Sequence, residues 1–386
     1  MARLAIIADS HFDEHNRFEE CIRLHHWIAA DLAGRWVDAV VHTGDVYDRK
    51  STPLERQAVA NWVRHVTEPA PLLILRGNHD AVDDLPLLAR LQTRHPVVVE
   101  QAAAVHIVGS VAVAAMAWPR KAALLAATGA ASKELGEQAA GEALRAVLRG
   151  LGQELSERKG PKFFAAHAMV RGSETSTGQP LVGHDLEVGL EDLALVGADA
   201  YVLGHIHKSQ AWDIGGAPVI YPGSPRRTDF GELEPKGYVI VDVTDSGIVS
   251  WEFVEAPATP MFHITDEWGV DGEGAVGWLA GAHGEPASVA EAEIRFRYRV
   301  PSDQREAARA AALVWRDRWL AEGAALVKLE EVVIAETRSR TPEVARAVTL
   351  PAKLEAFWAS KGFAPGDRRD ALLGKALELE EAHRAA

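Results

Sequence analysis

The sequence contains a single cysteine, Cys21, among its 386 residues. One thiol excludes an intramolecular disulfide framework and a cysteine-rich zinc site, and it is typical of proteins in a reducing compartment. We expect Cys21 to be a small buried hydrophobic residue on the first helix, and we expect the tandem His25-His26 on the same helix to bind no metal. Any metal site in this chain has to be built from oxygen and imidazole ligands.

Long hydrophobic runs and an excess of positive charge are also absent. No apolar stretch is long enough to span a bilayer, and the apolar segment after Arg3 is too short for a signal peptide, so we expect a cytoplasmic protein that does not contact membranes. The net charge of −14 and the pI near 5.6 argue against a general nucleic-acid-binding surface. A nucleic-acid enzyme is still compatible with this charge, because metal ions and a local basic rim can hold one phosphate in an acidic protein.

The length of the chain predicts more than one domain, and its composition is typical of globular proteins. The first part alternates apolar strands with amphipathic helical stretches, which predicts a layered α/β domain. Five apolar runs predict strands covered on both faces: Leu4–Ala8, Ala39–His42, Leu72–Leu75, Phe163–Ala166 and Ala200–Leu203. Apolar residues at helical spacing between Ser132 and Leu155 predict a surface-packed helix. From Trp212 to Val254, short strands and tight turns predict a second, antiparallel sheet edge.

Prolines at positions 257 and 260 predict a domain boundary, which divides the chain into residues 1–256, 257–337 and 338–386. In the second segment, residues 291–300 alternate strictly between apolar and polar side chains, which predicts a half-exposed strand with a basic outer face in a small α+β domain. The third segment predicts a helix–loop–helix whose short helices need a surface to pack on. That surface is either the body of the protein or a partner. The apolar face in question consists of Leu350, Leu354, Phe357 and Trp358.

Five polar motifs occur in one order along the chain, and four of them follow an apolar run. They are Asp9-Ser-His11, Gly44-Asp45-Val-Tyr-Asp48, Gly77-Asn78-His79-Asp80, the isolated His167, and Gly204-His205-Ile-His207. Carboxylate, amide and imidazole side chains that converge at strand ends form a binuclear site for borderline divalent metals. Taken singly, such a motif is more often a solvated turn or a hydrogen-bonded histidine than a ligand. Five together predict a two-metal centre.

The order and spacing of these motifs over residues 3–254 resemble the calcineurin-like metallophosphoesterase superfamily. The resemblance implies an α/β fold of four layers, in which a two-layered β-sandwich is flanked by helices and carries the metals on strand-end loops. The ligand set that it implies is Asp9, His11 and His207 for one divalent ion, Asn78, His167 and His205 for the other, and Asp45 as the bridge.

The same resemblance implies a catalytic role for His79, which is not a ligand in this pattern. His79 would face the scissile phosphate as an acid or charge stabiliser, with Asp48 supporting it. Imidazole suits this role because it titrates near the working pH. For Asp48, and for Asp80 in particular, a carboxylate that caps a turn is the alternative.

A narrower resemblance lies in residues 221–232, Tyr-Pro-Gly-Ser-Pro-Arg-Arg-Thr-Asp-Phe-Gly-Glu, followed by Lys236-Gly-Tyr. This run is similar to the segment after the last metal motif in SbcD-type nucleases, which are DNA-repair exonucleases that pair with an SbcC-type coiled-coil ATPase. By position, residues 261–336 correspond to the DNA-capping domain of that family, and the terminal helices correspond to its ATPase-docking segment. Archaeal and eukaryotic relatives often carry histidine where this chain has Asp48, so the resemblance is to the bacterial or phage branch.

The narrower resemblance implies a DNA exo/endonuclease subunit that uses two divalent metal ions, Mn²⁺ above all, and an ATPase partner; a homodimer is compatible with it. Candidate contacts to the DNA backbone are Arg49, Arg76, Arg120, Lys121, Arg171, Lys208, Arg226 and Arg227, each of which ordinary surface charge also explains. One alternative is a metallophosphoesterase for small phosphodiesters or phosphomonoesters, which would not need the second domain and terminal helices. Another is a non-catalytic DNA-tethering subunit, against which the complete ligand set argues.

Overall fold

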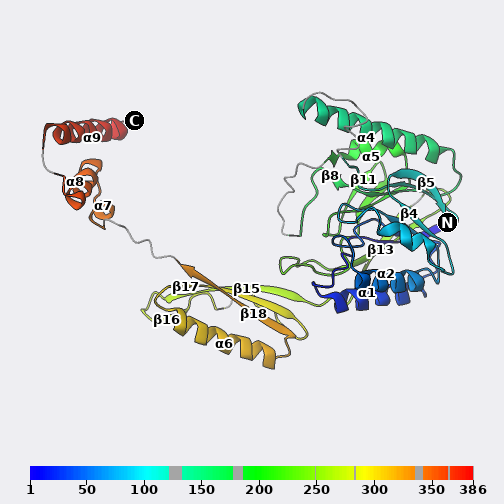
Figure 1. The fold of residues 1–386 in the computed structure, drawn as a ribbon, viewed down its shortest axis with the longest axis horizontal. Helices are drawn as coiled ribbons and strands as arrows, with labels where there is room; N and C mark the ends of the chain where they lie inside the picture. The colour runs from blue at the N-terminus through cyan, green and yellow to red at the C-terminus, as the bar shows by residue number, and fades with distance from the viewer. Residues whose placement is uncertain are drawn as a thin grey trace. The chain divides into compact units, whose positions relative to one another are not determined.

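The computed structural model describes residues 1–120, 133–176, 186–247, 249–281, 284–334, 342–363 and 366–385 (Figure 1). The chain divides into two compact units, of which the first comprises residues 1–265, 281–297 and 313–330, and the second comprises residues 266–280, 298–312 and 331–386. Because the two units interleave along the chain beyond residue 265, the division at residues 256 and 337 stays a prediction.

Two six-stranded sheets form the body of the first unit. One has the order β14-β13-β1-β2-β3-β4 and the other the order β11-β12-β10-β7-β6-β5. The strands of the first sheet are β1 (Ala2–Ile7), β2 (Ala39–His42), β3 (Leu72–Leu75), β4 (Val97–Glu100), β13 (Gly237–Val243) and β14 (Val249–Glu255). Those of the second are β5 (Ala103–Val108), β6 (Val111–Met116), β7 (Lys162–His167), β10 (Ala200–Gly204), β11 (Gln210–Ile214) and β12 (Ala217–Tyr221). β1 to β4 run parallel, as do β6, β7, β10 and β12.

Three hydrophobic clusters show that the sheets and helices form four layers. Leu4 and Ile6 of β1 point into a cluster that also contains Phe163 and Val202 of the other sheet, so this cluster lies between the sheets. The opposite face of the first sheet packs against α1 (Phe18–Leu32) and α2 (Pro53–Val66). The opposite face of the second sheet packs against α4 (Lys133–Ser156) and α5 (Leu190–Leu193). In Figure 1 the two helix pairs lie on opposite sides of the sheets, which confirms the predicted four-layer α/β fold.

The five predicted strands and the predicted helix all occur, with small shifts at their ends. The expectation of one antiparallel sheet edge over residues 212–254 is wrong in one respect. β11 pairs with β12 and β13 pairs with β14, both antiparallel, but the two hairpins extend different sheets. The chain crosses from one sheet to the other between Tyr221 and Gly237, and local turn signals do not encode such a crossing. Short elements complete this body: η1 (Leu85–Arg90), β8 (Met169–Val170), β9 (Glu187–Val188) and η2 (Ala194–Val196).

A separate four-stranded sheet has the order β16-β15-β17-β18. Its elements are β15 (Met261–Val270), β16 (Val276–Trp278), β17 (Glu293–Pro301), α6 (Arg305–Ala321) and β18 (Leu326–Ile334). The alternation predicted for residues 291–300 is confirmed, because the apolar side chains of β17 are buried. Its basic face is neutralised: Arg295, Arg297 and Arg299 lie 3.7, 3.6 and 3.1 Å from carboxylates of Asp229, Glu330 and Glu267.

The C-terminal helices are α7 (Pro342–Arg346), α8 (Leu350–Lys361) and α9 (Asp367–Ala385). Gly362 ends α8 in the left-handed conformation with a φ of 69°, where the chain enters the loop of the helix–loop–helix. None of the residues of α8 is buried, and 41% of the surface of Phe357 is exposed. Among the described helices, none has the length and apolar character needed to cross a membrane.

Candidate metal centre

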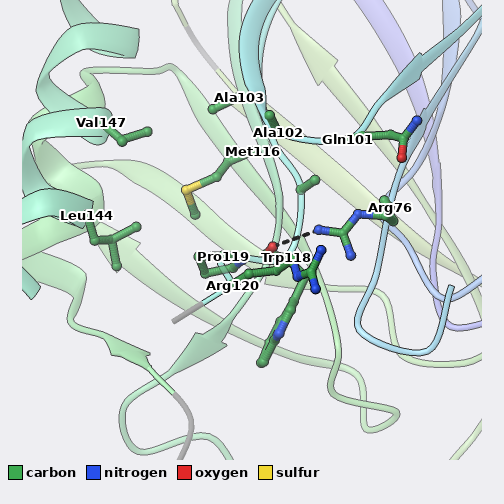
Figure 2. Close-up of a pocket in the computed structure, with 11 residues that line it drawn as sticks. Arg76, Gln101, Ala102, Ala103, Met116, Trp118, Pro119, Arg120, Leu144 and Val147 are labelled. Atoms are coloured by element: carbon green, nitrogen blue, oxygen red, sulfur yellow. Dashed lines mark hydrogen bonds between the residues drawn. The ribbon is translucent and has the colours of Figure 1, made fainter. Parts of the chain in front are cut away.

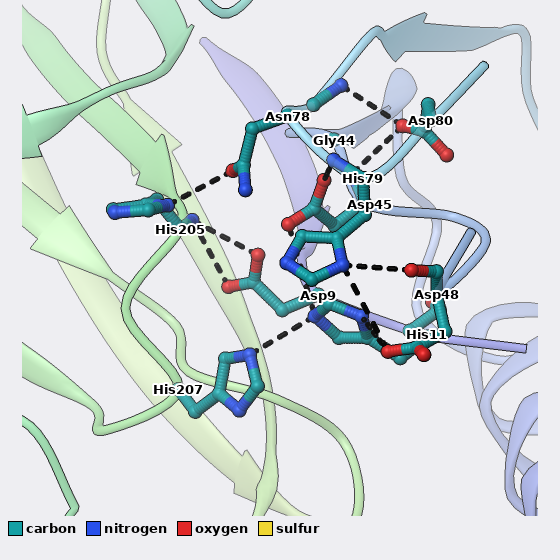
Figure 3. Close-up of polar contacts among 12 residues, drawn as sticks. Asp9, His11, Gly44, Asp45, Asp48, Asn78, His79, Asp80, His205 and His207 are labelled. Atoms are coloured by element: carbon teal, nitrogen blue, oxygen red, sulfur yellow. Dashed lines mark hydrogen bonds and ion pairs between the residues drawn. The ribbon is translucent and has the colours of Figure 1, made fainter. Parts of the chain in front are cut away.

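The five motifs meet at one place, between the C-terminal ends of strands from both sheets. The loops after β1, β2 and β3 come from one sheet, and β7 and the loop after β10 come from the other. Parallel neighbours end at the same sheet edge, so polar residues that follow them are brought together. Figure 3 shows the side chains of Asp9, His11, Asp45, Asn78, His205 and His207 turned toward a common centre. The convergence expected from the sequence is therefore present.

One group of ligand atoms comes from Asp9, His11 and His207, which lie within 4.8 Å of one another. The Nε2 atoms of His11 and His207 are 3.0 Å apart. The Nδ1 atom of His11 donates to Asp48 Oδ1 at 3.1 Å, and Nδ1 of His207 lies 3.6 Å from Glu232 Oε1. With a proton on each Nδ1, the two Nε2 lone pairs face each other, and only a proton or a cation between them makes this approach favourable. The donor set therefore fits a metal ion.

A second group comes from Asn78, His167 and His205. The side-chain oxygen of Asn78 lies 2.8 Å from His167 Nε2 and 3.0 Å from His205 Nδ1. The Nδ1 atom of His167 donates to the carbonyl of Thr43 at 2.8 Å, which leaves Nε2 free to bind a metal. One amide oxygen and two imidazole nitrogens are suitable ligands for a second divalent ion.

Asp45 lies between the two groups. Its Oδ2 atom is 3.7 Å from His11 Nε2 and 3.4 Å from His167 Nε2. Its other oxygen accepts the backbone N–H of His79 at 2.9 Å, which fixes the orientation of the carboxylate. A carboxylate that faces both groups is in the position of a bridging ligand, so the arrangement fits the predicted ligand set for two ions.

Backbone strain is concentrated in the loops that carry these ligands. Asp9, His11, Asp45 and His205 have φ values of 50°, 45°, 55° and 106°. Residues with side chains rarely adopt this region, and they do so mainly at functional sites that the surrounding structure holds in place. Gly77 is required for a related reason, because a Cβ there would collide with the carboxylate of Asp45. The loops after β2 and β3 approach too closely for a side chain between them.

Burial and neighbouring charges shift the pKa values of the predicted ligands in opposite directions. Burial lowers the pKa of His11 and lowers the pKa of His205 to about 3, so both are neutral and able to bind a cation. Burial also opposes the charge of His167, but the nearby carboxylates of Asp45 and Asp9 outweigh it and raise the pKa of His167 to about 9. For Asp45, burial is outweighed by the charge of His167, which holds the pKa of that carboxyl well below its usual range. Without metal, His167 and Asp45 form a buried ion pair, and a bound cation would replace the proton of His167.

His79 and Asp48 lie beside the two groups, and the contact between them differs from the expected one. The Nδ1 atom of His79 donates to the backbone carbonyl of Asp48 at 2.7 Å, and 42% of the surface of the His79 side chain is exposed. The carboxylate of Asp48 hydrogen-bonds to His11 instead and is 3.9 Å from His79 Nδ1. The main chain of Asp48 therefore positions His79, while its side chain orients a predicted ligand.

Asp80 caps a turn, which is the alternative that the sequence offers for this carboxylate. It is buried and accepts backbone N–H groups of Asp45, Tyr47 and Gly77, each at 2.9 Å. Burial and the charge of Asp45 raise the pKa of Asp80 to about 6. Asp80 thus ties together the two loops that carry Asp45 and Asn78.

A buried series of hydrogen bonds lies behind the site, and it joins residues whose pairing no local sequence pattern predicts. The Oγ atom of Ser10 lies 2.6 Å from His25 Nε2 and 2.7 Å from His42 Nε2, while Gly44 N–H donates to His42 Nδ1 at 3.3 Å and His25 Nδ1 lies 2.7 Å from the Cys21 carbonyl. One proton arrangement satisfies all four contacts: Gly44 donates to His42, His42 to Ser10, Ser10 to His25, and His25 to Cys21. Burial lowers the pKa of both histidines to about 3, so both stay neutral. This series of hydrogen bonds links helix α1 to the loops that carry Asp9, His11 and Asp45.

The predicted DNA contact of Arg226 is corrected by the structure. Arg226 is fully buried, and its guanidinium donates to the carbonyls of Ser10 at 3.5 Å and His11 at 2.6 Å. Arg227 is turned inward too, and it donates to three backbone carbonyls at 2.9, 3.3 and 3.0 Å. Arg76 is buried and donates to the carbonyls of Gly77 and Trp118. All three arginines therefore stabilise loops near the site, and full burial removes Arg226 from any DNA backbone.

Four of the other predicted basic contacts are described by the structure, and none of the four is buried. Arg49 pairs with Asp13 at 2.6 Å, Arg171 with Glu191 at 3.1 Å, and Lys208 with Glu174 at 2.7 Å. Arg120 is exposed. Lys121 lies outside the described residues. The role of these side chains in DNA binding stays a prediction.

Comparisons with known proteins add a family and a few distant likenesses. Residues 2–246 match the calcineurin-like phosphoesterase superfamily domain. The uncharacterized metallophosphoesterase YhaO of Bacillus subtilis (strain 168) is 38% identical over 92 residues, which are 23% of this chain and 20% of that protein. The match thus spans a fifth of the length of YhaO.

Two solved structures are similar at low TM-scores. GAP50, the anchor in the inner membrane complex of Plasmodium, has a TM-score of 0.42 at 16% identity, over 66% of this chain and 84% of that one. TT1561 of Thermus thermophilus has a TM-score of 0.38 at 14% identity, over 65% of this chain and 98% of that one.

Proposed function

Since the chain belongs to the calcineurin-like phosphoesterase superfamily, we propose that it is a two-metal phosphodiesterase acting on DNA, of the SbcD type, with Mn²⁺ as its metal. The observation that carries the proposal is the pair of ligand groups with Asp45 between them. Imidazole-rich motifs favour manganese over magnesium, because Mg²⁺ prefers carboxylate, phosphate and water ligands. The superfamily accounts for metal-dependent phosphoester hydrolysis, and the DNA substrate and the metal identity are the proposed part.

The residues around the site divide the chemistry between them. Two divalent cations held by the seven ligands supply Lewis-acid polarisation of a phosphate and activation of a water molecule. Asp48 and Glu232 face the Nδ1 atoms of His11 and His207, so they keep each Nε2 directed at the centre. His79 has its Nδ1–H fixed by a carbonyl and its ring partly exposed, so in the imidazolium form its Nε2–H can give a proton to the leaving oxygen and leave the neutral imidazole behind.

The assignment to the SbcD type is supported by the position of the segment that carries the resemblance. Within residues 221–236, Arg226 holds the carbonyls of Ser10 and His11, and Glu232 faces His207. Lys236 is buried and pairs with Glu232 at 2.6 Å, so it completes this support. The run that resembles the SbcD type therefore contacts the ligand group of Asp9, His11 and His207, and these contacts depend on its charged side chains.

Partners are part of the same proposal. An SbcC-type coiled-coil ATPase would bind the exposed side chains of α8, where Phe357 is an aromatic anchor of the kind that dominates such contacts. The ATPase would also supply the electrostatic grip on DNA that a chain of net charge −14 lacks.

An alternative function, hydrolysis of small phosphodiesters or phosphomonoesters, is favoured by one observation. Surface side chains expected at a DNA-binding rim, such as Arg49 and Lys208, are paired with carboxylates. Such pairing weakens attraction for a phosphate backbone. A non-catalytic tethering role has no comparable support, since each predicted ligand type is present at the centre.

The test compares two substrates with the purified full chain: linear duplex DNA and bis(p-nitrophenyl) phosphate. The proposal expects Mn²⁺-dependent degradation of DNA, loss of activity with a chelator, recovery with Mn²⁺, and weaker recovery with Mg²⁺. Hydrolysis of the small diester alone would favour the alternative function. Inactivity toward both, in protein shown by elemental analysis to carry two Mn²⁺ per chain, would overturn the proposal. Asp45→Ala provides the control without a bridging ligand.

A further inference from the structure

A pocket of about 260 Å³ lies next to the metal centre and takes no part in the chemistry described so far (Figure 2). One wall comes from α4, through Leu144 and Val147, and another from β6 and the residues after it, through Met116. Figure 2 shows these side chains directed into the same space. Binding pockets for drug-sized ligands usually measure ~300–1,000 Å³, so this one suits a single ring system.

Trp118 connects the pocket to the predicted metal ligands. Trp118 is one of the residues that line the pocket, and its ring centroid is 4.7 Å from that of His205 and 5.6 Å from that of His167. Its backbone N–H donates to the carbonyl of Arg76 at 2.9 Å, in the strand end that leads to Asn78. The pocket therefore begins one aromatic ring away from the ligand atoms, within reach of a group attached to a phosphate bound there.

Two arginines line the pocket, and among the residues that the structure describes neither forms an ion pair with a carboxylate. Arg76 donates two of its five N–H groups to the carbonyls of Gly77 and Trp118. Arg76 and Arg120 carry the same charge and line the same pocket, so an anion bound between them would relieve their repulsion. Elsewhere near the site, Arg49 and Lys208 are neutralised by acids, so this basic pair is a local attraction for an anion.

We propose that this pocket binds the nucleotide next to the scissile phosphate. The base would lie against Met116, Leu144 and Val147, and the adjoining phosphate would lie near Arg76 and Arg120. An apolar wall beside paired guanidinium groups matches a nucleotide, whose base has an apolar π-face and whose phosphate is an anion. The inference rests on the proposed function, since it names the substrate class of that same site.

The test uses two diesters with one leaving group: thymidine 5′-(p-nitrophenyl phosphate) and methyl p-nitrophenyl phosphate. The wild-type protein should have a kcat/KM at least about tenfold higher for the nucleoside diester, because its base is buried against apolar side chains that the methyl diester does not reach. Val147→Phe fills the pocket and Arg120→Ala removes a cation, so each should bring the ratio of the two kcat/KM values toward one. Ala146→Phe and Arg149→Ala are matched controls on exposed positions of α4, and they should keep the wild-type ratio.

A second measurement separates the pocket from the chemistry. Binding of dTMP in the presence of a chelator, followed by calorimetry, should be present in the wild-type protein and weakened about tenfold by Val147→Phe or Arg120→Ala. If both diesters are cleaved with equal kcat/KM and dTMP does not bind, the pocket inference is overturned while the phosphodiesterase proposal stands. If neither diester is cleaved but dTMP binds in a pocket-dependent manner, the pocket inference stands and the proposed reaction fails.

Discussion

At the scale of single residues, Asp45 and His79 have different surroundings, which matches the different roles proposed for them. Asp45 is buried and faces both ligand groups, whereas His79 is partly exposed and held through its Nδ1 by a carbonyl. His79 nevertheless lies within reach of His11 and Asp45, so its geometry alone is compatible with a third ligand group. Substitution of the two residues distinguishes these roles.

His79→Ala should keep two Mn²⁺ per chain and lower kcat by a factor of about 10²–10⁴, the usual contribution of a positioned acid–base group. Asp45→Ala should lose metal, because two cations then repel each other without the intervening carboxylate. Elemental analysis after dialysis, together with kcat on a chromogenic diester, measures both effects. Loss of a metal from His79→Ala would identify His79 as a ligand, and wild-type turnover would remove it from the mechanism.

The series of buried hydrogen bonds through Ser10 predicts an effect on stability. Ser10→Ala leaves a buried acceptor on His25 and a buried donor on His42 without partners, which should lower the free energy of unfolding by about 1–3 kcal/mol. Ser156→Ala, at an exposed serine, is the control and should change it by less than about 0.5 kcal/mol. Urea unfolding of the metal-free proteins measures the difference. Equal stability of the two variants would mean that this series of hydrogen bonds is not formed as described.

His167 makes the metal-free protein sensitive to pH. Its pKa in the folded state is raised to about 9, so it stabilises the fold fully below its unfolded pKa of roughly 6.5 and loses this contribution as pH rises through 9. The pKa of His207 is also raised, which acts in the same direction. The melting temperature in a chelator should therefore fall between about pH 6.5 and about pH 9.5.

His167→Gln removes one of these two titrating groups and should reduce the dependence of the melting temperature on pH, as thermal unfolding across the same pH range would reveal. Metal binding should have the opposite pH dependence, because a cation displaces the proton of His167 and its affinity rises with pH. Calorimetry in buffers of different ionisation enthalpy would detect the released proton. A melting temperature that rises with pH in the chelator would contradict the raised pKa.

At the scale of elements, helix α4 contains two glycines with opposite roles. Gly150 has open space where a Cβ would lie, so it makes no packing contact there. Gly152 is two residues further along, and a Cβ there would lie 2.5 Å from the carbonyl of Leu195. The helix therefore packs against η2 through one glycine and carries the other without a structural reason.

Gly150→Ala should raise the free energy of unfolding by about 0.4–1 kcal/mol, because alanine restricts the unfolded chain and is compatible with the helix. Gly152→Ala should lower it by about 1–3 kcal/mol, because the new methyl group displaces the η2 backbone. Urea denaturation of the two variants, which differ only in position on one helix, measures both. Equal effects would contradict the packing of α4 on η2.

At the scale of the whole molecule, the question is what the C-terminal helices contribute. α8 has no buried residue, and Arg369 of α9 lies over the ring of Trp358 at 5.0 Å, so the helices contact each other. The apolar side chains that α8 exposes need a surface to cover them. That surface is either the body of the protein or a partner.

Removal of residues 350–386 should leave Mn²⁺-dependent hydrolysis of a small diester unchanged and abolish co-purification with an SbcC-type ATPase. The point variant Phe357→Ser should weaken that association while Lys353→Ala, on an exposed polar position of α8, should not. Gel filtration and circular dichroism of the truncated chain provide the control for folding. An unfolded truncated protein would show that the helices belong to the core and that no partner needs to be invoked.

The sequence by itself determined the strands, the order of the motifs and the residues that meet at the centre. Runs such as Leu72–Leu75 are apolar throughout because both faces of the strand are covered, and this pattern is local. A polar residue placed directly after such a run lies at a sheet edge, so Asp9, Asp45 and Asn78 could be assigned to one site before the sheets were known. Family membership follows from the same pattern and is confirmed over residues 2–246.

Only the tertiary structure decided which groups are buried and what they contact. Arg226 looked like a surface cation, but it donates to the carbonyl of His11, 215 residues away in the sequence. The pocket beside Trp118 and the series of hydrogen bonds through Ser10 likewise depend on segments that are distant along the chain. The local sequence pattern indicates the periodicity of a strand or helix. Burial and hydrogen-bond partners depend instead on which distant segments of the chain pack against it. For that reason the choice of sheet for each hairpin and the support of each ligand could not be predicted from the sequence.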